Sequence, residues 1–439
     1  MRENAEIVVC GAGMAGLSAA YHLAVRNGVR NVVVVDEREP LTLTSDKGTQ
    51  GYRNWWPGPD DTMLRYVSRS IDLLEEIADE TNNVFRLNRR GYLFVTSSDE
   101  GVGKLRTNAA AVSAYGMGDV REHTAAGSYH PAEPEGYEGA LTGADLLLGD
   151  EARRVFPYLR GDTAAALHVR RAGWMNSVAL GDLLIRRCVG AGVRFVRDRV
   201  SGIDEANGEV RSVRLSSGAT IATNRVVLAA GPMLPEAGRM LGIDLPLVHE
   251  LHAKVTFNDT RGIIPRWSPF TIWIDEMSLT LDGNARAFPG GVHARPVDGP
   301  RGDEVWFIWT YDTTRCAPVW PPRYDAEYGD ACLRGLAHMM PAMAGYLASP
   351  ERGVTDGGYY CKTTDNRPLI GALPVQGAFV FGGLSGSGIM SSLSGGELVA
   401  AHVLGNALPA YAGAFDPTRY EDSAYAALVA HWGALAGQL

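Results

Sequence analysis

The order of apolar and polar positions is clearest near the start of the chain. The apolar run Ile7-Val8-Val9 predicts a buried strand, residues 17–25 have the pattern of a helix, and Val32 to Val35 predict a second buried strand. A glycine-rich stretch, residues 11–16, joins the first strand to the helix. The sequence therefore predicts one βαβ unit with a tight turn after its first strand.

Elements of both kinds are expected along the rest of the chain. Helices are predicted over 63–80, 179–189, 324–349 and 395–404. Strands are predicted over 91–95, 193–196, 225–231, 253–257, 270–274, 304–311 and 379–383, with a hairpin within 200–215. Residues 98–148 are polar, rich in glycine and alanine and only weakly periodic, and we interpret them as the helices and loops of an inserted cap.

The glycines of residues 11–16 have the spacing of a dinucleotide-binding turn. Gly11 permits the sharp turn, Gly13 lets the backbone approach a pyrophosphate, and Gly16 lets the helix pack closely on the strand. The helix N-terminus offers N–H groups to the phosphates. Asp36 follows Gly16 by 20 residues (36 − 16), where a carboxylate accepts a hydrogen bond from a ribose hydroxyl. We interpret the unit as a dinucleotide site; the alternative is a glycine turn in an ordinary α/β fold.

A second glycine loop lies near the C-terminus. The stretch Gly383-Leu384-Ser385-Gly386-Ser387-Gly388-Ile389-Met390 follows a predicted strand and leads into a helix. Small residues there let the backbone lie against a flat ring and donate N–H groups to its oxygens, and a helix N-terminus stabilises negative charge on a reduced ring. The alternative is a turn that only packs helix on strand.

Nucleotide-binding signals thus occur at both ends and in the middle of the chain. We expect an α/β fold with a discontinuous Rossmann-type domain, residues 1–85, 172–244 and 355–439. Residues 86–171 and 245–354 are expected to form a second, sheet-based (α+β) substrate or cap domain. A ligand would lie where the two domains meet.

Composition narrows the class of protein. The net charge of −9 makes nucleic acid and anionic membranes unsuitable partners. The five cysteines are scattered without a C-x-x-C pair, which argues against a disulfide framework and against a metal site. Neither a signal peptide nor a membrane span is expected from the apolar runs, so a cytoplasmic location is predicted.

Three stretches together resemble one enzyme family. The fingerprint with Asp36, the run Val226-Val227-Leu228-Ala229-Ala230-Gly231-Pro232, and Thr364-Asp365-Asn366-Arg367-Pro368-Leu369-Ile370-Gly371 with the second glycine loop are similar to the FAD-dependent D-amino acid oxidase, glycine oxidase and sarcosine oxidase family. The resemblance implies FAD as cofactor and hydride transfer to flavin N5 from a carbon next to an amine nitrogen, giving an imine. The central segments, 86–171 and 245–354, match in general pattern only.

The resemblance also implies which residues hold the cofactor. They come from the two glycine loops, the end of the second strand, the segment 44–48 that lies over the flavin in this family, and the middle and closing motifs. The expected cofactor contacts are Gly11, Gly13, Met14, Ala15, Gly16, Asp36, Glu37, Thr44, Ser45, Lys47, Gly48, Val200, Ala230, Gly231, Arg367, Gly383, Gly386, Ser387, Gly388, Ile389 and Met390.

The substrate site is expected around Arg53. This residue resembles the arginine with which sarcosine oxidases hold a substrate carboxylate, and a guanidinium matches a carboxylate bidentately. The alternative is a structural salt bridge from Arg53 to Asp60 or Asp61. Three aromatic residues beside it are candidates for a wall of the site or for core: Tyr52, Trp55 and Trp56.

Two further candidates come from predicted strands. Alternation turns one of Tyr359 and Tyr360 toward the flavin pocket, and we take Tyr360 as the candidate. His252 is a candidate proton acceptor for a substrate ammonium, although a strand histidine with a structural role is the alternative.

Three departures from the family bear on the cofactor and the acceptor. Met390 stands where sarcosine oxidases have a lysine that helps to bind the carboxylate, and the strand 304–311 lacks their second lysine, which promotes reaction with oxygen. Gly358 occupies the place of a cysteine that attaches FAD covalently in some members, and Cys361 follows three residues later. We therefore expect noncovalent FAD, and either oxygen or another electron acceptor.

The sequence thus predicts an FAD-dependent oxidoreductase that oxidises the C–N bond of an amino acid or a related amine, with secondary and cyclic amines included. Two alternatives stay open. One is a flavin-dependent monooxygenase, which shares the first fingerprint but usually carries a Gly-Asp pair where Gly382-Gly383-Leu384 stands here. The other is a redox-silent FAD-binding protein.

Overall fold

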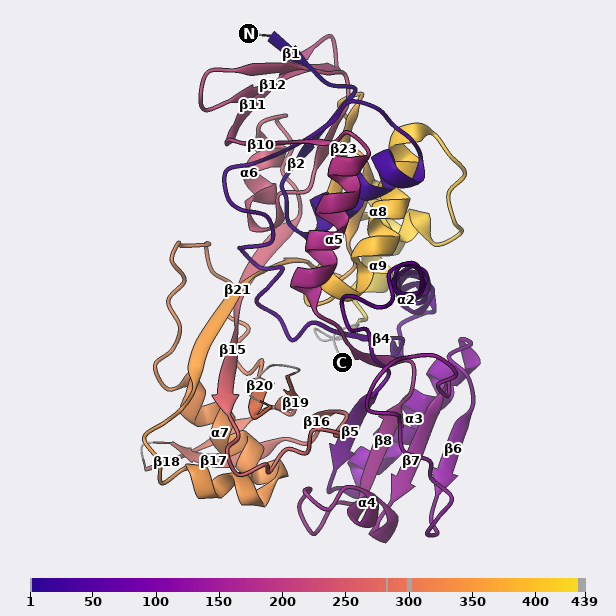
Figure 1. The fold of residues 1–439 in the computed structure, drawn as a ribbon, viewed down its shortest axis with the longest axis vertical. Helices are drawn as coiled ribbons and strands as arrows, with labels where there is room; N and C mark the ends of the chain where they lie inside the picture. Colours follow the sequence, from indigo (N-terminus) through magenta and orange to yellow (C-terminus); the bar gives the residue numbers. More distant parts are fainter. Residues whose placement is uncertain (1, 282, 298–301, 433–439) are drawn as a thin grey trace.

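A six-stranded sheet forms the upper half of the molecule in the computed structural model, which describes residues 2–281, 283–297 and 302–432 (Figure 1). Five strands run parallel and the edge strand β22 is antiparallel. The central strands are apolar throughout because both faces of the sheet are covered. The strand order is β10 (Arg194–Arg197), β3 (Val32–Asp36), β2 (Ile7–Cys10), β14 (Val226–Leu228), β23 (Ala378–Gly382) and β22 (Leu369–Ala372).

Helices cover one face of this sheet and a smaller sheet covers the other. The helical layer contains α1 (Met14–Ala20), which continues as a π-helical turn η1 (Tyr21–Arg26), with α5 (Ser177–Gly190) and α8 (Gly388–Leu404). The opposite layer contains α6 (Leu234–Arg239) and a four-stranded sheet of β1 (Arg2–Asn4), β13 (Thr220–Ala222), β12 (Glu209–Leu215) and β11 (Val200–Ala206).

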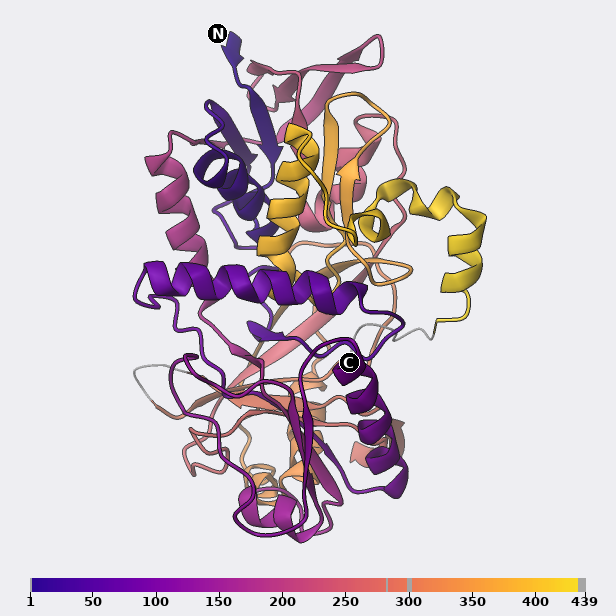
Figure 2. The same ribbon diagram turned by 90° about the vertical axis from the view of Figure 1, so that its right-hand side faces the viewer.

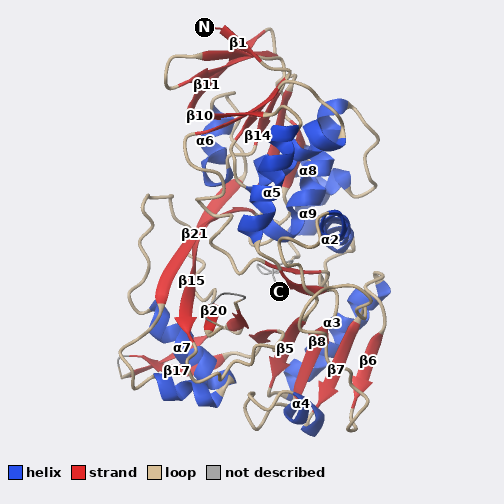
Figure 3. Cartoon of the chain, viewed as in Figure 1, coloured by secondary structure: helices blue, strands red, loops and turns tan. Residues whose placement is uncertain are grey.

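A nine-stranded mixed sheet forms the lower half (Figure 3). Its order is β21 (Val354–Thr363), β15 (Leu247–Asn258), β20 (Glu304–Ile308), β19 (His293–Pro296), β16 (Phe270–Trp273), β5 (Tyr92–Thr96), β8 (Ala165–Val169), β7 (Ala144–Leu148) and β6 (Val120–His123). The helices α3 (Asp99–Ala114), α4 (Asp150–Val155), α7 (Tyr328–Met339) and η3 (Pro341–Tyr346) accompany it, with the hairpin β17 (Met277–Leu281) and β18 (Asn284–Phe288).

Short elements connect the two halves. The helix α2 (Thr62–Glu80) lies across the middle of the molecule (Figure 2), next to the ribbon of β4 (Gly51–Arg53) and β9 (Ala172–Trp174). The C-terminal part contains three short helices, η4 (Ala412–Phe415), η5 (Pro417–Glu421) and α9 (Ser423–Val429), and η2 (Gly231–Met233) follows β14.

The α/β fold class is confirmed, with corrections to single elements. Residues 98–148 contain not only the helix α3 but also β6 and β7, which belong to the nine-stranded sheet. The predicted strand over 225–231 ends at Leu228, whereas β15 begins before 253, at Leu247. The last long helix begins at Gly388 rather than at 395.

Candidate functional site

A cavity with a volume of about 760 Å³ lies between the two large sheets. Both glycine loops line it, so Gly13 near the start of the chain and Gly386 near its end face the same space. The predicted meeting of the two ends of the chain around one cavity is therefore present in the structure.

The first glycine turn owes its shape to close backbone contacts. Gly11 has a φ of +113°, and a Cβ atom on it would lie 2.4 Å from the carbonyl oxygen of Ala229. A Cβ atom on Gly16 would lie 1.9 Å from the carbonyl oxygen of Gly11. The backbone can pass this point only with glycine at both positions. Gly16 packs helix on strand as expected and is not itself part of the cavity lining.

The N-terminus of α1 opens into the cavity. Met14 N donates to Ser45 Oγ at 3.0 Å, and a Cβ atom on Gly13 would meet only that hydroxyl, at 3.4 Å. Ser45 and Thr44 belong to the segment that crosses over this end of the cavity. The turn is therefore a cradle of N–H and hydroxyl groups, which suits a phosphate.

Asp36 ends β3 beside the same turn. One carboxylate oxygen accepts from Ala12 N at 2.7 Å and the other accepts from Arg38 N at 2.9 Å. These bonds orient the carboxylate toward the cavity, which Asp36, Arg38 and Glu39 line. A carboxylate keeps further lone pairs when each oxygen accepts one bond, so Asp36 retains acceptor capacity for a ribose hydroxyl.

The second glycine loop forms the opposite wall. Ser387 precedes α8, and the first turn of this helix, Gly388 to Met390, lines the cavity. A Cβ atom on Gly386 would lie 3.2 Å from the ring of Tyr360, so only a small residue leaves that ring in place. Tyr360 itself lines the cavity, but Tyr359 lines it too, so the predicted alternation does not separate the two tyrosines.

Arg53 lies in the cavity among aromatic rings. Its guanidinium carbon is 5.0 Å from the ring centre of Trp56 and 5.6 Å from that of Tyr92. Burial lowers the pKa of Arg53, and the neighbouring Tyr92 acts in the opposite direction. A cation in such surroundings is stabilised further by an anionic ligand. In the structure Asp60 pairs with Arg367 and Asp61 pairs with Arg65.

His252 lies in the cavity wall within a buried polar network. Its Nε2 is 3.0 Å from a carboxylate oxygen of Glu250, its Nδ1 is 3.1 Å from the hydroxyl of Thr310, and Glu250 also accepts from the ammonium of Lys362 at 2.9 Å. Burial lowers the pKa of His252, and Glu250 acts against that shift. The imidazole is therefore bound on both nitrogens before any substrate arrives, which fits a positioning role better than proton transfer.

Of the positions named with the departures from the family, Met390 and Cys361 line the cavity and Gly358 does not. Met390 lines it with an apolar side chain. Cys361 lines it too, and burial raises the pKa of this thiol to about 12, so the thiol stays protonated and unreactive near neutral pH.

Several predicted contacts lie outside the cavity lining. Tyr52 alternates with Arg53 along β4, so its ring is turned away and its hydroxyl donates to the carbonyl oxygen of Asn88 at 2.6 Å. Lys47 pairs with Asp46 and Asp356 instead of reaching the cavity. The other predicted cofactor residues outside the lining are Glu37, Val200 and Arg367.

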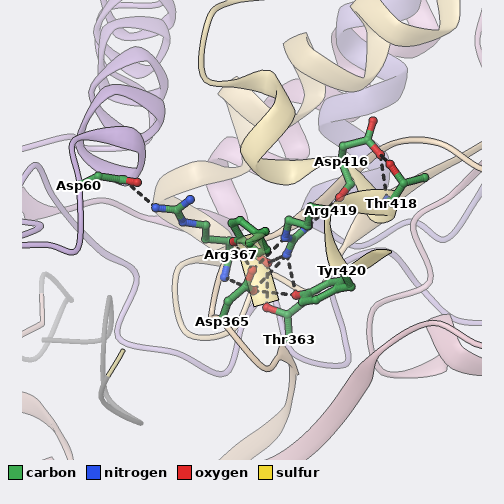
Figure 4. A network of polar contacts seen from close by, with 9 residues as sticks. Asp60, Thr363, Asp365, Arg367, Asp416, Thr418, Arg419 and Tyr420 are labelled. Atoms are coloured by element: carbon green, nitrogen blue, oxygen red, sulfur yellow. Dashed lines mark hydrogen bonds and ion pairs between the residues drawn. The ribbon is translucent and has the colours of Figure 1, made fainter. Parts of the chain in front are cut away.

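Arg367 has a structural role instead. Its guanidinium donates to Asp60 at 2.6 Å, and its carbonyl oxygen accepts from Arg419 at 2.9 Å (Figure 4). Arg419 in turn donates to Asp365, whose carboxylate is completely buried. This network anchors the C-terminal segment to the loop that precedes β22.

The largest group that the sequence did not reveal is aromatic. Tyr92, Phe94, Phe270, Ile272 and His293 all line the cavity beside Arg53. They come from β5, β16 and β19, which are neighbours in the nine-stranded sheet. The strands themselves are predictable, but the face that each turns to the cavity depends on their pairing.

Among the described helices, none is long and apolar enough to cross a membrane, and the cytoplasmic location stays a prediction. Within the same residues, no three His, Cys, Asp or Glu side chains gather to hold a metal ion.

Comparison with known proteins identifies relatives over nearly the whole chain. Mitochondrial sarcosine dehydrogenase of Mus musculus is 25% identical over 416 residues, which are 90% of this chain and 38% of that protein. The chain thus spans about two fifths of the length of the curated relatives first matched.

Solved structures share the fold at lower identity. L-proline dehydrogenase from P. horikoshii superposes with a TM-score of 0.76 at 22% identity, covering 96% of this chain and 99% of that one. Glycine oxidase from Geobacillus kaustophilus superposes with a TM-score of 0.74 at 18% identity, covering 95% and 99%. The model of the family described as FAD dependent oxidoreductase matches residues 6–402. The predicted family is therefore confirmed: the chain belongs to the FAD-dependent oxidoreductases.

Proposed function

We propose that this protein binds FAD noncovalently and oxidises the C–N bond of an amino acid or a related amine. The observation that carries the proposal is that the first glycine turn, the second glycine loop and Arg53 all line one cavity. Such a cavity brings a dinucleotide and a small anion together.

The chain contributes binding and orientation to this reaction. FAD, when bound, supplies the chemistry of accepting a hydride, for which no protein side chain is suited. The turn around Gly13 and the hydroxyl of Ser45 would hold the pyrophosphate, and Asp36 would accept from the adenosine ribose. The second glycine loop and the start of α8 would contact the flavin ring and stabilise negative charge there.

Arg53 would hold the substrate carboxylate. A buried guanidinium flanked by Trp56 and Tyr92 has a restricted orientation, and a carboxylate offers it a bidentate partner. Holding the carboxylate fixes the neighbouring C–H bond in one place, which is the main contribution that a protein makes to hydride transfer.

The division of the chain and the electron acceptor are also proposals. Residues 1–85, 172–244 and 355–439 would act as the FAD-binding domain, and residues 86–171 and 245–354 as the substrate domain.

Oxygen or another acceptor would take the electrons. Lys104 is the one lysine among the described residues that line the cavity, and its side chain is exposed on α3. None of these residues is therefore a buried lysine that would promote reaction of the reduced flavin with oxygen.

An anaerobic reduction experiment tests the proposal. The purified protein is loaded with FAD, freed of oxygen and mixed with amino acids, N-methyl amines and cyclic amines, while the absorbance of the flavin is followed. We expect at least one amine to bleach it and Arg53→Gln to lower the bleaching rate at limiting substrate by about 100-fold, because a charged hydrogen bond is lost. Arg65→Gln, on an exposed side chain, should have no effect. A protein that takes up no FAD, or whose FAD no amine bleaches, contradicts the proposal.

A further inference from the structure

Five aromatic residues line the cavity next to Arg53, and four of their rings are in contact with one another. We call Trp55, Trp56, Tyr92, Phe94 and Phe270 the aromatic chamber. The ring centres of Tyr92 and Phe270 are 4.4 Å apart, those of Tyr92 and Phe94 are 6.4 Å apart, and those of Phe94 and Trp55 are 5.6 Å apart. Trp56 joins the set through Arg53.

The rings of the chamber are almost completely buried, and the part of the cavity lining that they form is apolar. All five rings are at most 3% exposed, and Ile272 beside them is 1% exposed. The apolar lining continues through Leu105 and Ile274 toward exposed residues at a rim, Lys104 and Glu276. A ligand held at Arg53 therefore has apolar surface next to it over several side chains.

The negatively charged side chains of the cavity lie outside the aromatic chamber. The carboxylates among the described lining residues belong to Asp36, Glu39 and Glu276, and none of them is part of the chamber. His293 packs edge-on against Phe270, with ring centres 5.1 Å apart, and burial lowers its pKa to about 4, so its imidazole is neutral near pH 7. A cationic substituent placed in the chamber would find no carboxylate there and would lie near the Arg53 guanidinium, whereas an apolar one would find a matching wall.

We propose that the substrate is an amino acid with a large apolar side chain, aromatic for the best fit, whose carboxylate lies on Arg53 and whose side chain fills the aromatic chamber. The inference rests on the proposed function. A glycine-like or N-methylglycine-like substrate has no side chain to bury against these rings, and so would lose the free energy of burying an apolar side chain, about 1.5–3 kcal/mol. Converted at about 1.4 kcal/mol for each factor of ten, this is a preference of about 10- to 100-fold.

The preference is measured on the FAD-loaded protein. Stopped-flow reduction under anaerobic conditions yields the rate constant divided by the dissociation constant for glycine, sarcosine, alanine, leucine, phenylalanine, lysine and glutamate, each chiral amino acid as both enantiomers. We expect one enantiomer of phenylalanine, and leucine after it, to exceed alanine by about 10- to 100-fold. Glycine, sarcosine, lysine or glutamate above phenylalanine would overturn the inference. If neither these compounds nor any other amine reduces the flavin, the result would instead count against the proposed function.

A binding measurement that needs no turnover complements it. Acetate and phenylacetate carry the same carboxylate, and only the second has a ring. Trp55 and Trp56 lie in the cavity wall, so quenching of tryptophan fluorescence reports their occupation. We expect phenylacetate to bind at least tenfold more tightly than acetate, and equal affinities would contradict the chamber as a side-chain site.

Matched substitutions locate the effect. Phe94→Leu should lower the rate-to-dissociation ratio for phenylalanine by about tenfold relative to that for alanine. Phe307→Leu, which shortens an equally buried ring outside the cavity lining, should change neither. If both variants lower both ratios equally, or neither changes them, the chamber does not select the substrate.

Discussion

The imidazole of His252 lies parallel to the ring of Tyr360, with ring centres 4.0 Å apart and planes 7° apart. Glu250 and Thr310 hold the imidazole from its two nitrogens. On its other sides, Tyr360 lies against Gly386 and within reach of Gly48, so it connects the second glycine loop with the segment that crosses the cavity. His252, which is itself held by Glu250 and Thr310, therefore holds the ring of Tyr360 in place in the cavity wall.

Removing that support is expected to slow catalysis without removing the cofactor. His252→Ala leaves a gap beside Tyr360, and we expect anaerobic reduction by the best amine to slow by about tenfold, with the FAD content unchanged. His252→Phe restores a flat ring and should recover more than half of the lost rate. An alanine variant that reacts at the wild-type rate, or a phenylalanine variant no better than alanine, would show that the stack does not position Tyr360.

The turn at Gly16 is expected to tolerate no side chain. In Gly16→Ala the new methyl group would overlap the carbonyl oxygen of Gly11, so the turn must move. We expect the free energy of unfolding to fall by about 1–3 kcal/mol in urea, and the FAD content of the purified protein to fall with it. The control is Gly103→Ala in α3, where nothing lies within 4 Å of the added Cβ and helix propensity should stabilise by about 1 kcal/mol. A Gly16→Ala protein as stable and as yellow as the wild type would refute the close-contact argument.

The buried pair of Asp365 and Arg419 is expected to dominate the stability of the C-terminal segment. Asp365 accepts from Arg419 at 2.8 Å and from the hydroxyl of Tyr425 at 2.6 Å. Asp365→Asn leaves the Arg419 charge buried without its counter-ion and should cost about 3–5 kcal/mol of unfolding free energy. Asp422→Asn, at an exposed helix cap, should cost less than about 0.5 kcal/mol, because asparagine caps a helix as well as aspartate does.

The same pair predicts an acid limit. Burial acts to raise the pKa of Asp365, but the hydrogen bonds and charge of Arg419 outweigh it and lower the pKa to about 2. Its stabilisation is therefore fully present above the ordinary pKa of 3.8 and is lost as the pH falls through about 2. Urea unfolding between pH 5 and pH 2 should show a steeper loss in the wild type than in Asp365→Asn. Parallel curves would contradict this assignment.

Lys254 is expected to destabilise the protein at neutral pH. Its ammonium is buried 4.0 Å from the ring centre of Trp306, and burial lowers the pKa of Lys254 from 10.5 to about 8. The unfolded chain keeps this proton up to about pH 10.5, so the wild type gains stability as the pH rises from 8 to 10.5. Lys254→Met should be more stable at pH 7 by about 3 kcal/mol, with the difference shrinking toward pH 10.5. Lys104→Met, on an exposed side chain, is the control; a constant difference for Lys254→Met across this range would contradict the shifted pKa.

Local patterns were sufficient for the cofactor half of the molecule. The βαβ unit with its glycine turn and the second glycine loop are each contiguous in sequence, and a glycine that meets a backbone oxygen has few substitutes. The family motifs lie on these same stretches, so fold class and cofactor could be predicted before the structure was seen.

The substrate half depends on contacts between residues far apart in the chain. Tyr92 pairs with Phe270, 178 residues later (270 − 92), and this register turns both rings toward Arg53. The weakly periodic segment 98–148 forms strands because β7 adds to β8 at the sheet edge and β6 adds to β7. Arg53 and Tyr52 are neighbours on β4 and point to opposite sides of the strand, Arg53 into the cavity and Tyr52 into the core. Strand propensity is local, whereas the direction in which a strand turns its side chains is set by its partners, which no single segment encodes.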